Sequence, residues 1–197
     1  MDPFIMYDYF DILKETINHL NLHNTPERIW NLDESSLCID LRKTKVVGAV
    51  NKPSSRTIST PAFLMCNAAG GKPPPLIVYK GVNVWDQRMA HEGKGYPGTV
   101  YAATKNGWME TEVFTNYFLK TILRTIGEQR PVLITQTSVT YDGHSTHISL
   151  ALIERAIQEN ITILKLPPHT SHLLQPLDLA VFKPFKTKWD FHGIGSM

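Results

Sequence analysis

The spacing of apolar and polar residues predicts a chain that begins with a helix and several strands. Residues 4–20 place apolar side chains at helical intervals, which predicts a first helix. RIWNLDESSLCIDL, TKVVGAVNK and TISTPAFLMCNAAG have the composition of three strands, and Gly70 and Gly71 end the third. The prolines of KPPPLIVYKG cannot donate to a sheet, so we expect them in a loop or sheet edge before a fourth strand.

The second half of the chain predicts an alternation of helices and strands. Residues 81–109 are rich in glycine and polar side chains and predict a long, partly irregular connection. METEVFTNYFLKTILRTI has a helical period, with Thr111 as its expected N-cap and Gly127 as its stop. The rest is listed in order: a strand in VLITQTSVTY, a helix in HISLALIERAIQEN, a strand in ITILKL, and a last helix in LDLAVFKPFKTKW, interrupted by Pro184. This order predicts an α/β fold, a mixed sheet flanked by helices.

Composition places the chain among ordinary globular proteins. Its 197 residues, 42% hydrophobic and 19% charged, suit one α/β domain and exclude extensive disorder. The N-terminal segment lacks the basic start of a signal peptide, and no apolar run is long enough to span a bilayer, so we expect a soluble intracellular protein. Cys38 and Cys66 lie in strand-like runs and are expected to be buried thiols rather than a disulfide framework.

Charge is informative in its distribution rather than in its sum, which is only +2. Basic residues gather in two clusters, which are either nucleic-acid contacts or solvated faces. The clusters are Arg42, Lys43, Lys45, Lys52 and Arg56, and then Lys183, Lys186 and Lys188.

Three carboxylates near the ends of predicted elements indicate a site for a divalent metal. Asp33 and Glu34 end an apolar stretch and are expected near a strand end, Asp142 closes the β-branched strand, and Asp178 stands at an expected helix start. Each alone is most simply a cap or turn residue, but three that converge can bind Mg²⁺, which prefers oxygen ligands. Two such ions can activate an attacking oxygen and stabilise the leaving oxygen of a phosphodiester. The pattern therefore favours phosphoryl-transfer chemistry.

The segments around these acids resemble the three signature blocks of the DDE-superfamily transposases, most closely the pogo/Tigger/jerky group. The blocks are NLDES, YDGHSTH and LPPHTSHLLQPLD, and GGKPPPLIVYKG and TEVFTNYFL are also similar to that group. The resemblance implies an RNase H-like fold, with a DDE-type endonuclease domain over residues 1–190 and a short irregular tail over 191–197. It implies cleavage and strand transfer of DNA with Mg²⁺ or Mn²⁺, two ions being held by Asp33, Asp142 and Asp178.

The same resemblance implies DNA as the partner, no membrane, assembly into a homo-oligomer and a location in the nucleus. The expected DNA contacts come from the basic clusters and from histidines beside the acids. They are Arg42, Lys43, Lys45, Lys52, Arg56, His144, His169, Lys183 and Lys186.

Three departures from the family pattern favour a second interpretation, a domesticated nucleic-acid-binding protein that has lost catalysis. TQTSVT carries an insertion at 135–140 before Asp142, and the chain ends in FHGIGSM soon after Asp178. The helix-turn-helix region that precedes this domain in relatives is also expected to be absent, as in a fragment, a degenerate copy or a domesticated remnant.

Other side chains leave alternatives open. The pairs His144/His147 and His169/His172 are compatible with a zinc hydrolase, with DNA-facing groups beside the acids, or with loop residues. Glu34 is either a helper ligand or an exposed neighbour of Asp33. The tryptophans at 30, 85, 108 and 189 are expected in the core or at its rim rather than stacked on bases.

Overall fold

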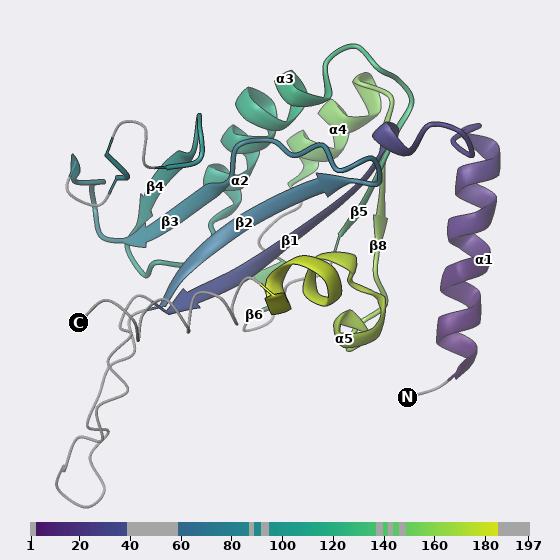
Figure 1. Ribbon diagram of the computed structural model, residues 1–197, viewed down its shortest axis with the longest axis horizontal. Coiled ribbons are helices and arrows are strands. Elements are labelled where there is room, and N and C mark those ends of the chain that lie inside the picture. Colours follow the sequence, from purple (N-terminus) through teal and green to yellow (C-terminus); the bar gives the residue numbers. More distant parts are fainter. Residues whose placement is uncertain are drawn as a thin grey trace, which may run out of the picture.

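A six-stranded mixed sheet forms the centre of the computed structural model, which describes residues 3–38, 59–86, 89–91, 95–136, 140–141, 144–145 and 149–184 (Figure 1). The strand order is β4-β3-β2-β1-β5-β8. The strands are β1 (Ile29–Cys38), β2 (Ser59–Asn67), β3 (Leu76–Lys80), β4 (Val100–Thr104), β5 (Val132–Gln136) and β8 (Ile161–Lys165). β2 runs antiparallel to β1 and β3, whereas β3–β4, β1–β5 and β5–β8 are parallel pairs.

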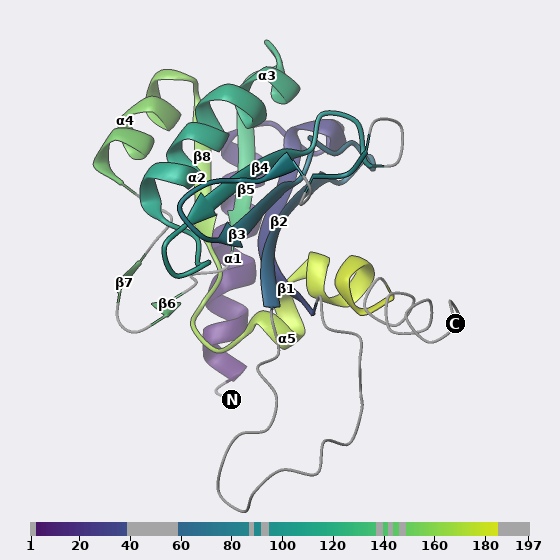
Figure 2. The same cartoon turned by 90° about the vertical axis from the view of Figure 1, so that its left-hand side faces the viewer.

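Helices cover the two faces of this sheet unequally. Figures 1 and 2 show α2, α3 and α4 on one face and the short α5 and η4 on the other, against β1. Helix α1 lies beyond the β8 edge (Figure 1). The helical elements are α1 (Pro3–His19), η1 (Pro26–Arg28), α2 (Thr111–Tyr117), η3 (Phe118–Ile122), α3 (Leu123–Ile126), α4 (Leu150–Gln158), α5 (Ser171–Leu174) and η4 (Asp178–Phe182), and a two-residue pair, β6 (Thr140–Tyr141) and β7 (His144–Ser145), forms a separate ladder.

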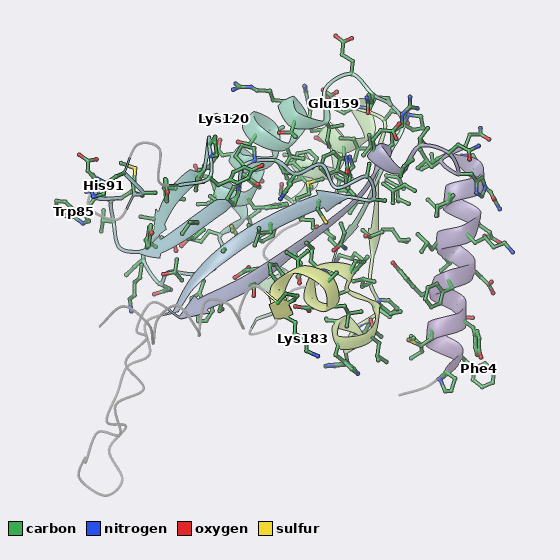
Figure 3. All side chains as sticks on the ribbon, in the orientation of Figure 1. Phe4, Trp85, His91, Lys120, Glu159 and Lys183 are labelled. Atoms are coloured by element: carbon green, nitrogen blue, oxygen red, sulfur yellow. The ribbon has the colours of Figure 1, made fainter. Side chains whose placement is uncertain are left out.

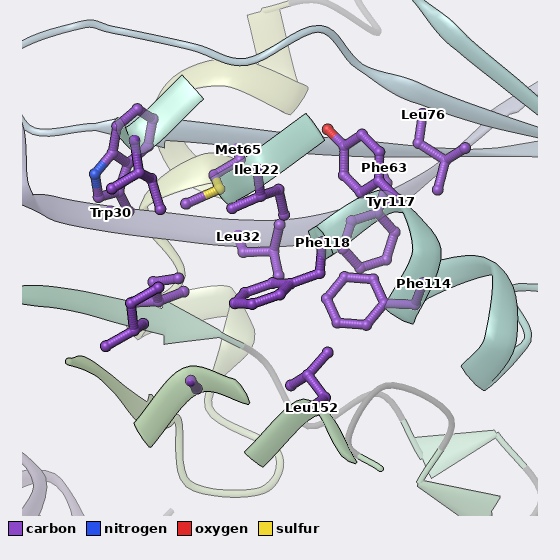
Figure 4. Close-up of a cluster of buried hydrophobic side chains, with 14 of the residues drawn as sticks. Trp30, Leu32, Phe63, Met65, Leu76, Phe114, Tyr117, Phe118, Ile122 and Leu152 are labelled. Carbon is purple, nitrogen blue, oxygen red and sulfur yellow. The ribbon is translucent and has the colours of Figure 1, made fainter. Parts of the chain in front are cut away.

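The hydrophobic core lies between the sheet and the α2–α4 side (Figure 4). Trp30 and Leu32 enter it from alternate positions of β1, because successive side chains of a strand point to opposite faces. Phe114 and Phe118 meet them from α2 and η3, at the four-residue spacing that aligns side chains on one helical face. The core therefore fixes which face β1 presents to the opposite side of the sheet.

Most of the predicted elements are confirmed, including the first helix, the strand through Asp33, the β8 strand and the stop at Gly127, which has φ 66°. The prediction of a partly irregular connection over 81–109 missed β4, a five-residue strand that pairs with β3 at the edge of the sheet. Thr111 is the first residue of α2, and Glu110 holds the N-cap position instead. The predicted strand TKVVGAVNK lies outside the described residues.

Candidate active site

The strand β1 has a polar face that is buried rather than solvated. Asn31, Asp33 and Ser35 alternate with the core residues and are only 6%, 6% and 4% exposed. Their neighbours across the antiparallel pair with β2 are Cys66, Leu64 and Ala62. A carboxylate so far from water requires compensating partners, so this face is a special environment for Asp33.

Asp33 does not close its strand, which corrects the prediction that it lies near a strand end. It is the fifth residue of β1, which continues to Cys38 in partnership with β2. The parallel pairing with β5 nevertheless stops at Leu32 opposite Gln136. Asp33 is therefore the first residue of β1 beyond the parallel pair, at the edge where β5 leaves the sheet.

The connection between α5 and η4 delivers Asp178 to the same face of the sheet. Gln175 ends α5 in an extended conformation with ψ 105°, as expected for a residue before proline. Pro176 begins the next helical segment, where its missing N–H costs nothing. Asp178 is the first residue of η4, which confirms its predicted place at a helix start, and it is half-buried.

Two hydrogen bonds join this connection to β1. The Gln175 side-chain Nε2 donates to the Leu32 carbonyl at 3.3 Å, and the Leu177 backbone N–H donates to Asn31 Oδ1 at 3.2 Å. Asp33 directly follows Leu32, and Asp178 directly follows Leu177. The structure thus places the backbone segments that carry two of the three predicted carboxylates side by side, although 145 positions of sequence separate Asp33 from Asp178.

The remaining predicted site residues fall into two groups. Asp142, Lys186 and the whole first basic cluster (Arg42, Lys43, Lys45, Lys52 and Arg56) lie outside the described residues. The backbone of His144 is described, in β7, whereas the nearby His147 lies outside the described residues. His169 and Lys183 are exposed and lie on the same side of the sheet as Asp178.

An open depression of about 660 Å³ surrounds Asp178. Its walls combine one carboxylate with groups that can donate hydrogen bonds, and they are His169, Ser171, His172, Asp178, Leu179 and Lys183. Figure 3 shows Lys183 projecting from the α5–η4 side. The mixture suits an anionic ligand held beside a carboxylate-bound cation, since His169, His172 and Lys183 are exposed while Asp178 is half-buried. No sign in the sequence singled out Ser171 or Leu179.

The donor chemistry of this face fits a hard divalent cation. Asp33 and Asp178 offer carboxylate oxygens, which Mg²⁺ and Mn²⁺ prefer. The Ser35 hydroxyl, on the face of Asp33, is buried without a hydrogen-bond partner among the described residues, so a metal-bound water would satisfy it. Within the described part of the chain, which does not include Asp142, no three or more His, Cys, Asp or Glu side chains cluster as a metal site.

Sequence reasoning missed that the polar residues of this face are buried. Asn31, Thr135 and Gln175 are 6%, 8% and 0% exposed. Asn31 was visible as a polar residue between two apolar strand residues, which is the pattern of a solvated face. The burial of that face arises from the α5–η4 connection, which the local sequence of β1 does not reveal.

The tryptophans, Cys66 and Glu34 lie in different environments. Trp30 is in the core, whereas Trp85 and Trp108 are 64% and 43% exposed. Cys66 is a half-buried free thiol on the Asn31 side of β2. Burial raises the pKa of the Cys66 thiol, and the Lys72 ammonium lowers it in part. Glu34 faces the core side, opposite to Asp33, so it does not share the face of the two acids.

Comparisons with known proteins identify the family of this chain. A family model described as DDE superfamily endonuclease matches residues 58–193, a range that contains Asp142 and Asp178 and begins after Asp33. The chain is also 34% identical over 127 residues to a Cochliobolus lunatus protein named MFS-type transporter clz9, which covers 61% of this chain and 12% of that protein. The chain therefore spans about an eighth of that relative. Across the residues described, none of the helices has the length and apolarity needed to cross a membrane.

Two solved structures share the fold. The crystal structure of a pre-cleavage Mos1 transpososome has a TM-score of 0.52 at 13% identity, covering 92% of this chain and 47% of that chain. The Mos1 strand transfer complex has a TM-score of 0.54 at 13% identity, covering 96% and 49%. At this identity the likeness concerns the fold, and it confirms the predicted RNase H-like mixed sheet flanked by helices.

Proposed function

Because this chain belongs to the DDE superfamily endonuclease family, we propose that it is a transposase-derived domain that cleaves DNA phosphodiester bonds and transfers strands. We assign it to the pogo/Tigger/jerky group on its three sequence blocks, and we propose a nuclear site of action and assembly into oligomers. The observation that supports the proposal is that the bonds of Gln175 and Leu177 hold the turn before Asp178 against the buried polar face of β1 that carries Asp33.

The metal ligands in this proposal are Asp33, Asp142 and Asp178. When bound, a pair of Mg²⁺ or Mn²⁺ ions supplies the Lewis acidity that activates the attacking oxygen and neutralises the leaving one. Asp33 is held by a central strand in a nearly dry environment, where its charge interacts strongly with a cation. Asp178 lies at the wall of the open depression, where a DNA phosphate can approach.

The exposed donors around that depression orient the DNA. Lys183 contributes a positive charge, and His169 and His172 contribute ring N–H groups on the same wall. Such contacts bind the phosphate backbone irrespective of sequence, and their affinity falls steeply with salt. They position the scissile phosphate beside Asp178 without defining a target sequence. Names of the similar structures, a Mos1 transpososome and a Mos1 strand transfer complex, support DNA as the substrate.

The test is metal-dependent nicking of supercoiled plasmid by the chain and by Asp33→Asn, Asp142→Asn and Asp178→Asn. Asparagine keeps the size of each side chain and removes its charge. We expect nicking with Mg²⁺ or Mn²⁺ that falls by about 100-fold or more in each variant, as when a group that stabilises transition-state charge is removed. Asp86→Asn, at an exposed acid in the loop after β3, is the matched control and should nick like the native chain.

Two results would contradict the proposal. Nicking that survives chelation of the metal, or that is equally lost in Asp86→Asn, would mean that these carboxylates are not its source. Salt-sensitive DNA binding without any nicking would instead identify a DNA-binding protein that has lost catalysis.

A further inference from the structure

We propose that Asn31 is a positioning residue that sets the spacing of Asp33 and Asp178, an inference that rests on the proposed function of these two acids. Asn31 lies two residues before Asp33 on the same face of β1. Its side chain reaches both the neighbouring strand β5 and the backbone just before Asp178.

The side-chain amide of Asn31 both donates and accepts hydrogen bonds. Its Nδ2 donates to the Thr135 carbonyl at 3.1 Å and to Thr135 Oγ1 at 3.0 Å. Its Oδ1 accepts the Leu177 backbone N–H at 3.2 Å. Thr135 Oγ1 in turn donates to the Trp30 carbonyl at 3.2 Å, which fixes the orientation of its lone pairs toward Asn31. Both the nitrogen and the oxygen of the Asn31 side chain are therefore hydrogen-bonded.

This arrangement determines where η4 begins. Leu177 is 1% exposed and lies at the start of a helical segment, where a backbone N–H has no partner within the helix. Its N–H instead donates to Asn31 Oδ1. Gln175, fully buried, adds a second bond from the same turn to the Leu32 carbonyl. The turn is thus held against β1 by two bonds, one from Leu177 to Asn31 and one from Gln175 to Leu32. Leu177 directly precedes Asp178, and Leu32 directly precedes Asp33.

These buried hydrogen bonds fix one geometry of the η4 turn on β1. Buried polar groups that are fully paired specify a unique arrangement, whereas an apolar contact would let the short η4 shift along β1. A shift of about 1 Å between catalytic groups is enough to cost about 100-fold in rate. Asn31 therefore acts on metal binding and turnover through Asp33 and Asp178, without touching the metal.

The test compares Asn31→Leu with Thr135→Val in the full chain. Leucine has a similar size and leaves the Leu177 amide without its acceptor. Valine removes the Thr135 hydroxyl, and with it two bonds of the same cluster, but keeps the bond between Asn31 and Leu177. Two readouts are taken: hydrogen exchange of the Leu177 amide, and Mn²⁺ binding followed by electron paramagnetic resonance of the free ion.

We expect the Leu177 amide to exchange its hydrogen at least about tenfold faster in Asn31→Leu, as for one lost buried hydrogen bond. The Mn²⁺ concentration that half-saturates the protein should rise by about tenfold or more. Thr135→Val should change both by less than about threefold. Equal effects in the two variants, or no effect in Asn31→Leu, would overturn the inference. If Asn31→Leu does not fold, Asn31→Ala, which removes the same acceptor with a smaller side chain, is judged by the same two readouts.

Failure of the proposed function gives a different result. A native chain that binds no Mn²⁺ contradicts the metal site, while the exchange rate of Leu177 still decides whether Asn31 holds the η4 turn to β1.

Discussion

The Tyr117 hydroxyl links α2 to the proline run before β3, and its removal gives a prediction with two independent parts. The hydroxyl donates to the Pro74 carbonyl at 2.6 Å, and the side chain is 3% exposed. Tyr117→Phe keeps the ring in the core and removes only this bond. We expect the free energy of unfolding at pH 7 to fall by about 1–2 kcal/mol, the usual cost of one lost buried hydrogen bond.

The second part concerns pH. Burial raises the pKa of Tyr117 far above its ordinary value, so the folded protein holds the proton that the unfolded chain releases above about pH 10. The stability due to this group is therefore complete below pH 10 and is lost as pH rises further. At pH 11 the loss in the native chain is about 1.4 kcal/mol, and Tyr117→Phe does not suffer it. The difference between the two proteins should nearly vanish.

Urea denaturation followed by tryptophan fluorescence at pH 7 and pH 11 measures both parts. Tyr96→Phe, at a tyrosine that is 47% exposed, controls for the loss of a tyrosine hydroxyl as such and should leave stability at pH 7 unchanged within about 0.5 kcal/mol. A gap between native and Tyr117→Phe that stays constant from pH 7 to pH 11 would refute the reasoning, because it would mean that the hydroxyl ionises equally in the folded and unfolded states.

Two further predictions concern the helices on the core side of the sheet. Ser149 Oγ accepts the Leu152 N–H at 3.1 Å as the N-cap of α4, so Ser149→Ala should lower stability by about 1 kcal/mol and Ser149→Asp should largely preserve it in thermal melts. Arg130 donates to the Gly127 and Gln129 carbonyls and pairs with Glu159 at 3.2 Å, so Arg130→Lys should cost about 1 kcal/mol or more by urea titration. A lysine as stable as arginine would show that charge alone matters there.

The strand β1 shows how far its sequence predicts the site. The alternation of Trp30 and Leu32 with Asn31 and Asp33 determines which side chains share a face, and the structure confirms that division. Alternation alone predicts a solvated polar face, as in many antiparallel sheets. The face is buried instead because residues 175 and 177 bond to β1 across 143 and 146 positions of sequence. A local pattern contains no information on such distant pairing.

Short elements were harder to predict than long ones. The helix over Pro3–His19 and the helical run from Thr111 to Ile126 have enough turns for their period to be evident. β4 has five residues, and four of them are only partly buried, so its composition resembles that of a connection. It forms because β3 offers a parallel neighbour through Leu76–Lys80, which is again a long-range cause.

The position of Asp33 shows why a ligand site can lie in the middle of a strand. Sites in α/β sheets gather where parallel strands end, since the loops leaving there are free to carry polar groups. In this sheet the parallel pair of β1 and β5 ends at Leu32 and Gln136, while β1 alone continues beside β2. The strand end that matters for such a site is therefore the end of the parallel β1–β5 pairing, and Asp33 is the next residue of β1 after it. The η4 turn bonds to β1 immediately before this point, so the segment that carries Asp178 lies on the polar face beside it.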